Sequence, residues 1–260
     1  MVCCRRTAQR RRADASKVRR SRAELSDESN TLKPDLHRPS YSTENFMNLN
    51  RRVFSTAVVS TGLGVLTLSA AAQTPAPTEG VQYTRVQPAL PTQSGTKIEV
   101  LEFFSYACPH CSAFEPTLEA WVKTLPADVS FRRVPVPFLM NAEGFQRLYY
   151  TLETLGKLDT VHRKVFTAIH VDRLRLDKPA DMAELAAKNG IESAKFLDVY
   201  NSFSVANSVT KAKRLVGEYK LESVPALAVH GKYMTSPSQA GSAENTLTTA
   251  NYLIAQARKG

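Results

Sequence analysis

The chain has 260 residues, and its 43% hydrophobic share is that of a globular protein, which excludes wholesale disorder. This length is enough for one or two domains with a buried core. Four cysteines are too few for a disulfide-dense scaffold. The 34 Lys and Arg against 24 Asp and Glu give a formal charge of +10, which raises the question of a nucleic-acid partner.

The excess positive charge lies mostly near the N-terminus. Residues 1–46 carry a net charge of +5, whereas residues 73–260 carry 21 basic and 18 acidic side chains, a net charge of +3. Folds that bind nucleic acid concentrate basic residues in a patch or stripe. We therefore expect no nucleic acid to bind the folded part of this protein.

Residues 47–72 have the pattern of a secretory signal peptide. A short positive region is followed by an uncharged apolar stretch from Val53 to Leu68 and by three alanines that fit a cleavage site. The stretch is shorter than the ~20 residues that a spanning helix needs, which disfavours an uncleaved anchor. The pair Arg51-Arg52 is compatible with a twin-arginine signal and with a general secretory signal.

A signal peptide begins at a start codon, and Met47 stands at that point. Residues 1–46 are polar and Arg-rich without hydrophobic periodicity, so we interpret them as a disordered or wrongly assigned N-terminal extension. Export would leave two cysteines in the mature chain, in an oxidising compartment.

The first part of the mature chain predicts a strand–helix–strand unit. Residues 73–95 suggest a linker followed by a short edge strand. Residues 97–105 form a strand that is apolar on both faces and therefore central in a sheet. Apolar side chains then recur at helical spacing as far as Leu125, and residues 129–134 form a second strand.

The rest of the chain is first helical and then returns to strands. Residues 141–212 contain several apolar patterns at helical spacing, which predict an inserted helical domain between the parts 73–140 and 213–260. In the last part, residues 225–234 predict a hairpin, and Ser242 can cap a final helix. The order of elements predicts one α/β domain with a helical insertion.

The segment Cys108-Pro109-His110-Cys111 follows the central strand and opens the helix. The first helical turn offers unpaired N–H groups and the positive end of the helix dipole, and both favour a thiolate. His110 can add a positive or donor interaction. Two intervening residues let the sulfurs form and break a disulfide by exchange, and a stabilised thiolate makes that disulfide an oxidant of other thiols.

The sequence supports two other interpretations of this cysteine pair less well. A zinc site would need two further ligands, and the histidines of the mature chain form no close pair, so we expect no metal. A purely structural disulfide across two residues would restrain little chain.

The segment EFFSYACPHCSAFEP, its strand–helix–strand setting, the helical insertion and the later SVPAL closely resemble the DsbA family of bacterial periplasmic thiol:disulfide interchange proteins. The resemblance covers residues 80–260, and Cys-Pro-His-Cys is typical of this family, whereas thioredoxins usually carry Cys-Gly-Pro-Cys. It implies a thioredoxin fold with an inserted helical domain. The resemblance also implies a low thiol pKa and an oxidising disulfide.

The resemblance also implies roles for individual residues. Cys108 would be the exposed nucleophile and Cys111 the buried resolving thiol. Val224-Pro225 matches the cis-proline beside the disulfide, where the backbone could bind an extended substrate. The alternative is an ordinary trans proline at the start of a strand.

Two carboxylates match acidic positions near the buried cysteine of the family. Glu102 lies on the central strand and Glu115 on the helix, and either could move a proton as Cys111 reacts. The alternatives are a structural ion pair for Glu102, with Arg133 as an available partner, and a solvated helix face for Glu115. Tyr106 and its neighbour replace a more aromatic pair, which we expect to alter the substrate groove.

The sequence therefore predicts an exported, monomeric oxidase of protein thiols that acts in the periplasm. The resemblance implies exported folding proteins with free thiols as substrates, and a membrane quinone-linked partner of the DsbB type that reoxidises the cysteines. No separate cofactor is expected. One alternative is a disulfide isomerase or reductase of the same fold, and another is a non-catalytic periplasmic chaperone or binding module.

Overall fold

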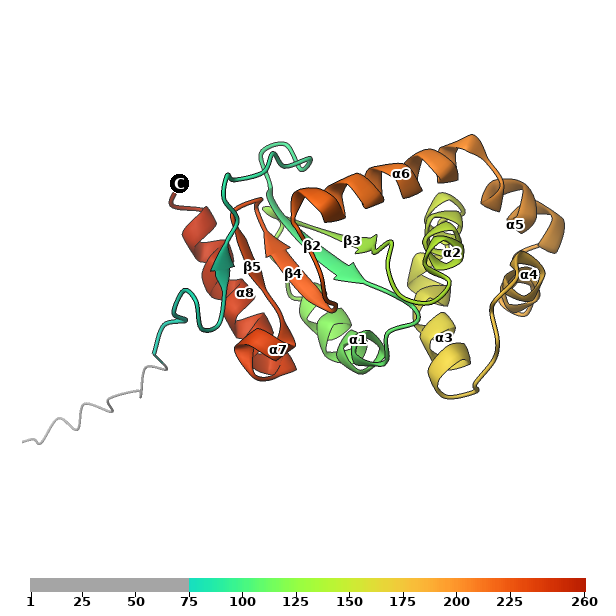
Figure 1. The fold of residues 1–260 in the computed structure, drawn as a ribbon, viewed down its shortest axis with the longest axis horizontal. Coiled ribbons are helices and arrows are strands. Elements are labelled where there is room, and N and C mark those ends of the chain that lie inside the picture. Colours follow the sequence, from blue (N-terminus) through green and yellow to red (C-terminus); the bar gives the residue numbers. More distant parts are fainter. Residues whose placement is uncertain (1–74) are drawn as a thin grey trace, which may run out of the picture. The chain divides into compact units, whose positions relative to one another are not determined.

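The computed structural model describes residues 75–260, so the predicted signal peptide and the segment before it lie outside the described residues. One five-stranded sheet, in the order β1-β5-β4-β2-β3, forms the centre of the fold (Figure 1). Its strands are β1 (Thr84–Arg85), β2 (Ile98–Phe104), β3 (Val129–Pro135), β4 (Ala226–Val229) and β5 (Tyr233–Thr235). β2 pairs with β3 in parallel, and every other pairing is antiparallel.

The predicted strand–helix–strand unit is confirmed. Helix α1 (Pro109–Val122) connects β2 to β3, because a parallel pair needs a crossover that returns the chain to the same end of the sheet. All seven residues of β2 are buried, as the apolar character of both its faces predicts. The carboxyl end of this central strand delivers the chain directly to the start of α1.

Alternate residues of β2 serve two separate apolar clusters. Ile98 and Val100 pack in the cluster that includes side chains of α1 and of α8 (Ala243–Ala257). Leu101 and Phe103 belong to the cluster on the opposite face of the strand, which includes side chains of the inserted helices. Ser242 caps α8 as predicted, since its side chain accepts a hydrogen bond from the backbone N–H of Asn245.

Five helices follow β3 before the chain returns to the sheet. Figure 1 shows the first four at one end of the fold and the fifth running from that end back to the sheet. They are α2 (Ala142–Thr154), α3 (Leu158–His170), α4 (Pro179–Ala187), α5 (Ser193–Tyr200) and α6 (Phe203–Glu218). α6 runs through residue 212, so the chain leaves the predicted insertion inside a continuous helix. A short helix that the sequence analysis did not predict, α7 (Pro237–Ala240), precedes α8. This arrangement is the predicted α/β thioredoxin fold with inserted helices.

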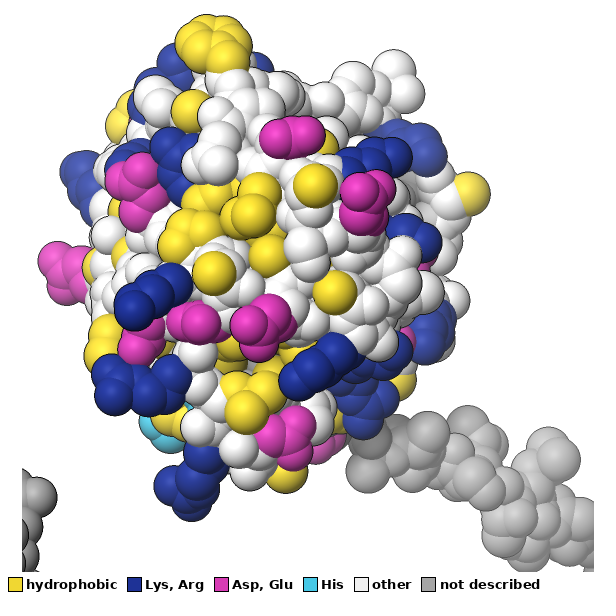
Figure 2. All heavy atoms as spheres, turned by 90° about the vertical axis from the view of Figure 1, so that its right-hand side faces the viewer, with side chains coloured by type: hydrophobic (Ala, Val, Ile, Leu, Met, Phe, Trp, Pro, Cys, Tyr) yellow, Lys and Arg dark blue, Asp and Glu magenta, His cyan; other side chains and the backbone are white. Residues whose placement is uncertain are grey.

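Charged side chains of both signs are interspersed on the helical end of the molecule, with apolar side chains between them (Figure 2). No basic stripe is seen on that face. Within residues 75–260, no helix combines the length and the apolar character that a membrane span requires.

The hairpin between β4 and β5 turns at His230 and Gly231, as predicted. Both residues have positive φ, 51° and 66°, as the two central residues of a type I′ turn do. A Cβ on Gly231 would overlap the backbone carbonyl of Leu90, whose N–H donates to the Gly231 carbonyl at 2.9 Å. This glycine therefore lets the segment before β2 pack against the hairpin.

We expect Gly231→Ala to lower the free energy of unfolding by roughly 2–3 kcal/mol, because it adds both left-handed strain and a backbone overlap. Gly217→Ala is the matched control, since Gly217 lies in α6 with nothing within 4 Å of an added Cβ. That control should raise stability by about 0.5 kcal/mol. Urea unfolding of both variants measures the difference, and equal effects would contradict the packing argument.

Candidate active site

Cys108 is the N-cap residue of α1. Its backbone is extended, with φ −89° and ψ 115°, and its Sγ accepts the backbone N–H of Cys111 at 3.3 Å. The sulfur thus takes the position that Ser or Asp oxygens occupy in ordinary helix caps. Pro109 follows in the first turn, where the missing N–H leaves no hydrogen bond unmade.

The two cysteines have opposite acidities. Both are free thiols in this structure. The hydrogen bond from the Cys111 side chain lowers the pKa of Cys108 to about 6, and the backbone N–H groups of Cys111 and His110 add to this effect against the opposing effect of burial. Burial and the hydrogen bond to Cys108 raise the pKa of Cys111 far above its usual range. At neutral pH the negative charge therefore lies on Cys108 and the proton on Cys111.

Cys108 is more enclosed than the sequence predicts. The expected exposed nucleophile is only 6% exposed, while Pro109 and His110 beside it are exposed and Cys111 is fully buried. The physical reason is a segment far away in the sequence: the Val224 carbonyl oxygen lies 3.6 Å from the Cys108 Sγ and can accept a hydrogen bond from the protonated thiol.

The segment that covers Cys108 contains a cis peptide bond. Val224–Pro225 is cis, which agrees with the expectation from the sequence and excludes the trans alternative. Pro225 directly precedes β4, which pairs with β2 on one side and β5 on the other. The pairing of β4 with β2 thus brings residue 224 to the sulfur of residue 108.

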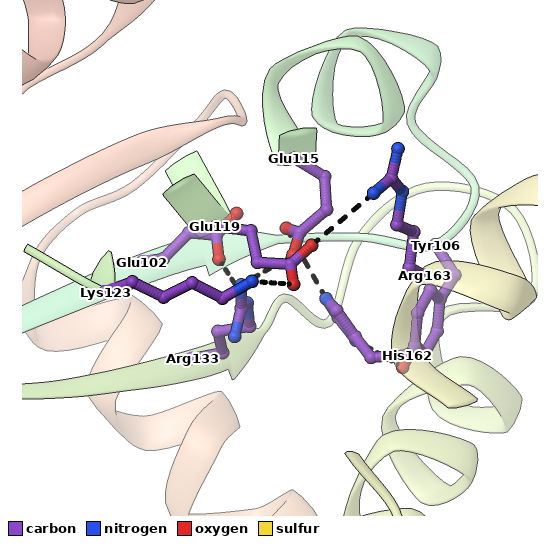
Figure 3. A network of polar contacts seen from close by, with 8 residues as sticks. All are labelled: Glu102, Tyr106, Glu115, Glu119, Lys123, Arg133, His162 and Arg163. Carbon is purple, nitrogen blue, oxygen red and sulfur yellow. Dashed lines mark hydrogen bonds and ion pairs between the residues drawn. The ribbon is translucent and has the colours of Figure 1, made fainter. Parts of the chain in front are cut away.

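A network of ion pairs and hydrogen bonds joins β2, β3, α1 and α3 (Figure 3). Glu102 on β2 faces Arg133 in the register of the parallel pair, and the Arg133 Nε lies 2.9 Å from the Glu102 Oε2. The Arg133 guanidinium also donates to Glu115 of α1 at 2.6 Å. Glu102 thus contacts Arg133, the partner that was expected for its structural alternative.

The expected alternative of a solvated helix face for Glu115 is wrong. Its side chain is 2% exposed, because its position on α1 turns it toward β3 and toward α3. Its second carboxylate oxygen lies 3.5 Å from the His162 Nε2 of α3. A cleft of about 660 Å³ between α1 and α3 is lined by Glu115, Arg133 and His162, so the network reaches water on this side.

The network has two carboxylates for one guanidinium. Burial raises the pKa of Glu102 to about 8, although Arg133 lowers it, and the nearby Glu115 raises it further. Burial opposes the charge on Arg133, but both carboxylates raise its pKa. Glu102 therefore holds a proton at neutral pH, in a fully buried position that also affects the acidity of Cys111.

Tyr106 lies in the core of the protein, and the expected effect of Tyr106 and Ala107 on the substrate groove stays a prediction. The side chain is completely buried, and its hydroxyl is hydrogen-bonded to the His162 Nδ1 at 2.7 Å. The place of His162 in this site was not predicted from the sequence. This residue lies beside Val161 in a helix whose apolar spacing gives no sign that one of the buried residues is polar.

Fold and site together define a class: a thioredoxin-fold protein with an acidic nucleophilic cysteine, a buried partner thiol and an adjacent cis-proline. A family profile described as DSBA-like thioredoxin domain matches residues 128–244. The thiol:disulfide interchange protein DsbA of Bordetella parapertussis is 46% identical over 179 residues, which are 68% of this chain and 85% of that protein. The protein of the same name from Azotobacter vinelandii is 42% identical over 213 residues, 81% of this chain and 99% of that protein.

Solved structures agree with this similarity. The crystal structure of Pseudomonas aeruginosa DsbA has a TM-score of 0.68 at 41% identity and covers 70% of this chain and 95% of that chain. The oxidoreductase NmDsbA1 from Neisseria meningitidis has a TM-score of 0.63 at 25% identity, over 70% of this chain and 94% of that chain. The chain belongs to the DsbA family of thiol:disulfide oxidoreductases.

We expect the reduced protein to show a thiolate with a pKa of about 6, measured by the ultraviolet absorbance of the thiolate against pH. Because this pKa lies below the unfolded value of 9.0, the thiolate stabilises the reduced fold fully above pH 9, and this stabilisation is lost as pH falls through about 6. Cys108→Ser should show neither the absorbance nor the pH dependence. A titration near 9 in the unaltered protein would contradict the site described here.

Glu102→Gln should remove a pH dependence of stability with the opposite sign. The folded pKa of about 8 lies above the ordinary 4.5, so the stability contributed by Glu102 is complete below pH 4.5 and is lost as pH rises to about 8. Between these pH values, the free energy of unfolding measured with urea should therefore fall less steeply with rising pH for Glu102→Gln than for the unaltered protein. Glu119→Gln is the control. Lys123 lowers the pKa of Glu119, so the contribution of Glu119 to stability changes with pH only below pH 4.5.

Proposed function

We propose that the protein is an exported oxidase that donates the Cys108–Cys111 disulfide to folding proteins with free thiols. The observation that carries this direction of reaction is the difference in acidity between the two cysteines. A thiolate stabilised on Cys108 favours the reduced dithiol form, and a disulfide whose reduced form is stabilised is a strong oxidant. Membership of a family of thiol:disulfide interchange proteins supports it.

The exchange proceeds in two steps. A substrate thiolate attacks the Cys108 sulfur of the disulfide, the bond between the enzyme sulfurs breaks, and Cys111 leaves as a thiolate that takes up a proton. A second substrate thiolate then attacks the substrate sulfur of the mixed disulfide and releases Cys108 as a thiolate. The substrate loses two electrons and two protons. One proton goes to Cys111 and the other to water, and the enzyme disulfide becomes the Cys111 thiol and the Cys108 thiolate.

The side chains around the cysteines support these steps. Cys108 is a good leaving group in the second step because its pKa is low. Glu102, protonated at neutral pH and buried, would give its proton to Cys111 in the first step, and Glu115 would exchange protons with water in the cleft between α1 and α3. The exposed Pro109 and His110 would set the approach of the substrate.

The substrate would bind as an extended segment beside the cis-proline. The backbone of Val224 lies at the start of β4 and next to Cys108, and an extended chain that pairs with this backbone would bring its own sulfur to the nucleophile. Pro225 keeps the segment in this position. Recognition through backbone groups suits an enzyme that must accept many sequences.

The remaining features complete this proposal. Export by the signal peptide at residues 47–72 would deliver the protein to the periplasm, where the disulfide is not held reduced. A membrane quinone oxidoreductase of the DsbB type would reoxidise the dithiol, so that no separate cofactor is needed. The helical domain at residues 141–212 would cover one side of the site, and the protein would act as a monomer without a nucleic-acid partner.

The purified protein should lose its disulfide in a mildly oxidising glutathione buffer, and should oxidise a reduced, unfolded test protein with stoichiometric loss of thiols. Cys108→Ser should abolish this oxidation. A disulfide that persists until the buffer is strongly reducing would instead indicate the reductase or isomerase alternative. Suppression of aggregation that survives in Cys108→Ser, without any thiol oxidation by the unaltered protein, would indicate the chaperone alternative.

A further inference from the structure

One face of α3 packs against the turn that leads to Cys108. His162, Phe166 and His170 are spaced four residues apart, so they lie one above another on this face. All three contact Tyr106: the His162 Nδ1 is 2.7 Å from its hydroxyl, the Phe166 ring centroid is 5.1 Å from its ring centroid, and the His170 Nε2 is 2.8 Å from its backbone oxygen. Both the side chain and the backbone of Tyr106 are therefore tied to the inserted helices.

Tyr106 lies inside the short turn that joins β2 to α1. The Cys108 N–H donates to the Ser105 carbonyl at 3.1 Å, and the Ala107 N–H donates to the Ser105 Oγ at 3.2 Å. This turn directly precedes the N-cap, so its position sets where Cys108 meets the N–H of Cys111. Tyr106 itself is fully buried and two residues from the nucleophile.

The tautomer of His162 follows from its two partners. The Nε2 lies 3.5 Å from a Glu115 oxygen, and the other oxygen of that carboxylate accepts from Arg133 at 2.6 Å. At 3.5 Å the Nε2 and the Glu115 oxygen form no hydrogen bond, but the negative oxygen favours the ring nitrogen that carries a proton. We therefore assign the proton to the Nε2 and the acceptor of the Tyr106 hydroxyl to the Nδ1. Burial lowers the pKa of His162, which keeps the ring neutral and the Nδ1 available as an acceptor. The result is a directed chain from Arg133 through Glu115 and His162 to Tyr106 (Figure 3).

We propose that His162 and His170 are positioning residues of the active site: they hold Tyr106, and through it they hold Cys108 against its hydrogen-bond donors. This inference deepens the proposed function, because it rests on Cys108 as the nucleophile. The inserted helices would then do more than cover the site. They would also influence the reactivity of Cys108, which lies outside the insertion.

The effect depends on the geometry of one hydrogen bond. The Cys108 Sγ accepts the Cys111 N–H at 3.3 Å, and such a bond weakens as its length and angle depart from the best geometry. A turn that is less firmly held would let the sulfur move away from its donors for part of the time. The thiolate would then be less stabilised, and the disulfide would become a weaker oxidant.

Tyr106→Phe is the first test, because it keeps the ring between Phe104 and Phe166 and removes only the hydroxyl. We expect the Cys108 pKa to rise by about 0.5 unit or more, and the glutathione equilibrium to shift roughly threefold toward the disulfide. Tyr149→Phe is the matched control: Tyr149 is also buried, with its ring centroid 6.0 Å from that of His162, but it lies on α2 and not in the turn. This control should leave both quantities unchanged.

Two substitutions of His162 separate its two contacts. In His162→Asn the amide oxygen stands close to the Nδ1 position and can still accept from Tyr106, whereas in His162→Gln the amide nitrogen stands close to the Nε2 position and can only donate to Glu115. Both leave a buried site imperfectly filled and should lower thermal stability alike. Only His162→Gln should shift the pKa of Cys108 and the glutathione equilibrium in the direction of Tyr106→Phe.

His170 tests the backbone contact independently, and its partial exposure makes misfolding less of a concern. His170→Leu removes the donor to the Tyr106 carbonyl and should shift both quantities in the same direction, whereas His170→Gln, which keeps an N–H donor, should restore them in part. Shifts in Tyr149→Phe as large as those in Tyr106→Phe would overturn the inference, as would unchanged values in Tyr106→Phe or in His170→Leu. If the unaltered protein itself shows an ordinary thiol pKa, it is the proposed function that fails.

Discussion

The hydrogen bond from the Cys111 N–H to the Cys108 Sγ, 3.3 Å long, joins the fold to its chemistry. It exists because a buried central strand ends immediately before a helix begins, so that the first cysteine takes the N-cap and the second lies one turn inside. The helix then stabilises a negative charge on one sulfur and buries the other. The same strand, β2, carries Glu102, and it pairs with β4, which directly follows the cis-proline segment. Nearly every part of the site is therefore fixed relative to the carboxyl end of β2.

A second constraint is the excess of negative charge in the network around Arg133. A buried guanidinium that serves two buried carboxylates leaves one negative charge too many, and in a poorly solvated site the excess is removed by binding a proton. The proton is held by Glu102, whose pKa is raised to about 8. Burial thus turns what would be a simple structural ion pair into a store for a proton beside a thiol that must gain one.

The elements of the fold were largely predictable from the sequence, because each has a local cause. The strand apolar on both faces, the helix that opens with Pro109, and the hairpin at His230 and Gly231 all follow from short-range patterns. The cysteine pair and the cis-proline were recognisable because their residue types are unusual at those places. The expectations that were wrong concern burial: Cys108, which was expected to be exposed, is covered, and the solvated alternative for Glu115 does not hold.

By itself the sequence determined the order of the strands and helices, the redox-active pair at the start of a helix, and the family, since each depends on residues that are neighbours in the chain. Tertiary structure alone decided which polar groups meet: Arg133 with two carboxylates, and His162 and His170 with Tyr106. These contacts join residues 18 to 64 positions apart. The pairing of β2 with β3 and the position of α1 form the contacts of Arg133, and the packing of α3 against the turn before α1 forms those of the two histidines. The spacing of a helix shows which side chains share a face, but it does not show what that face will touch.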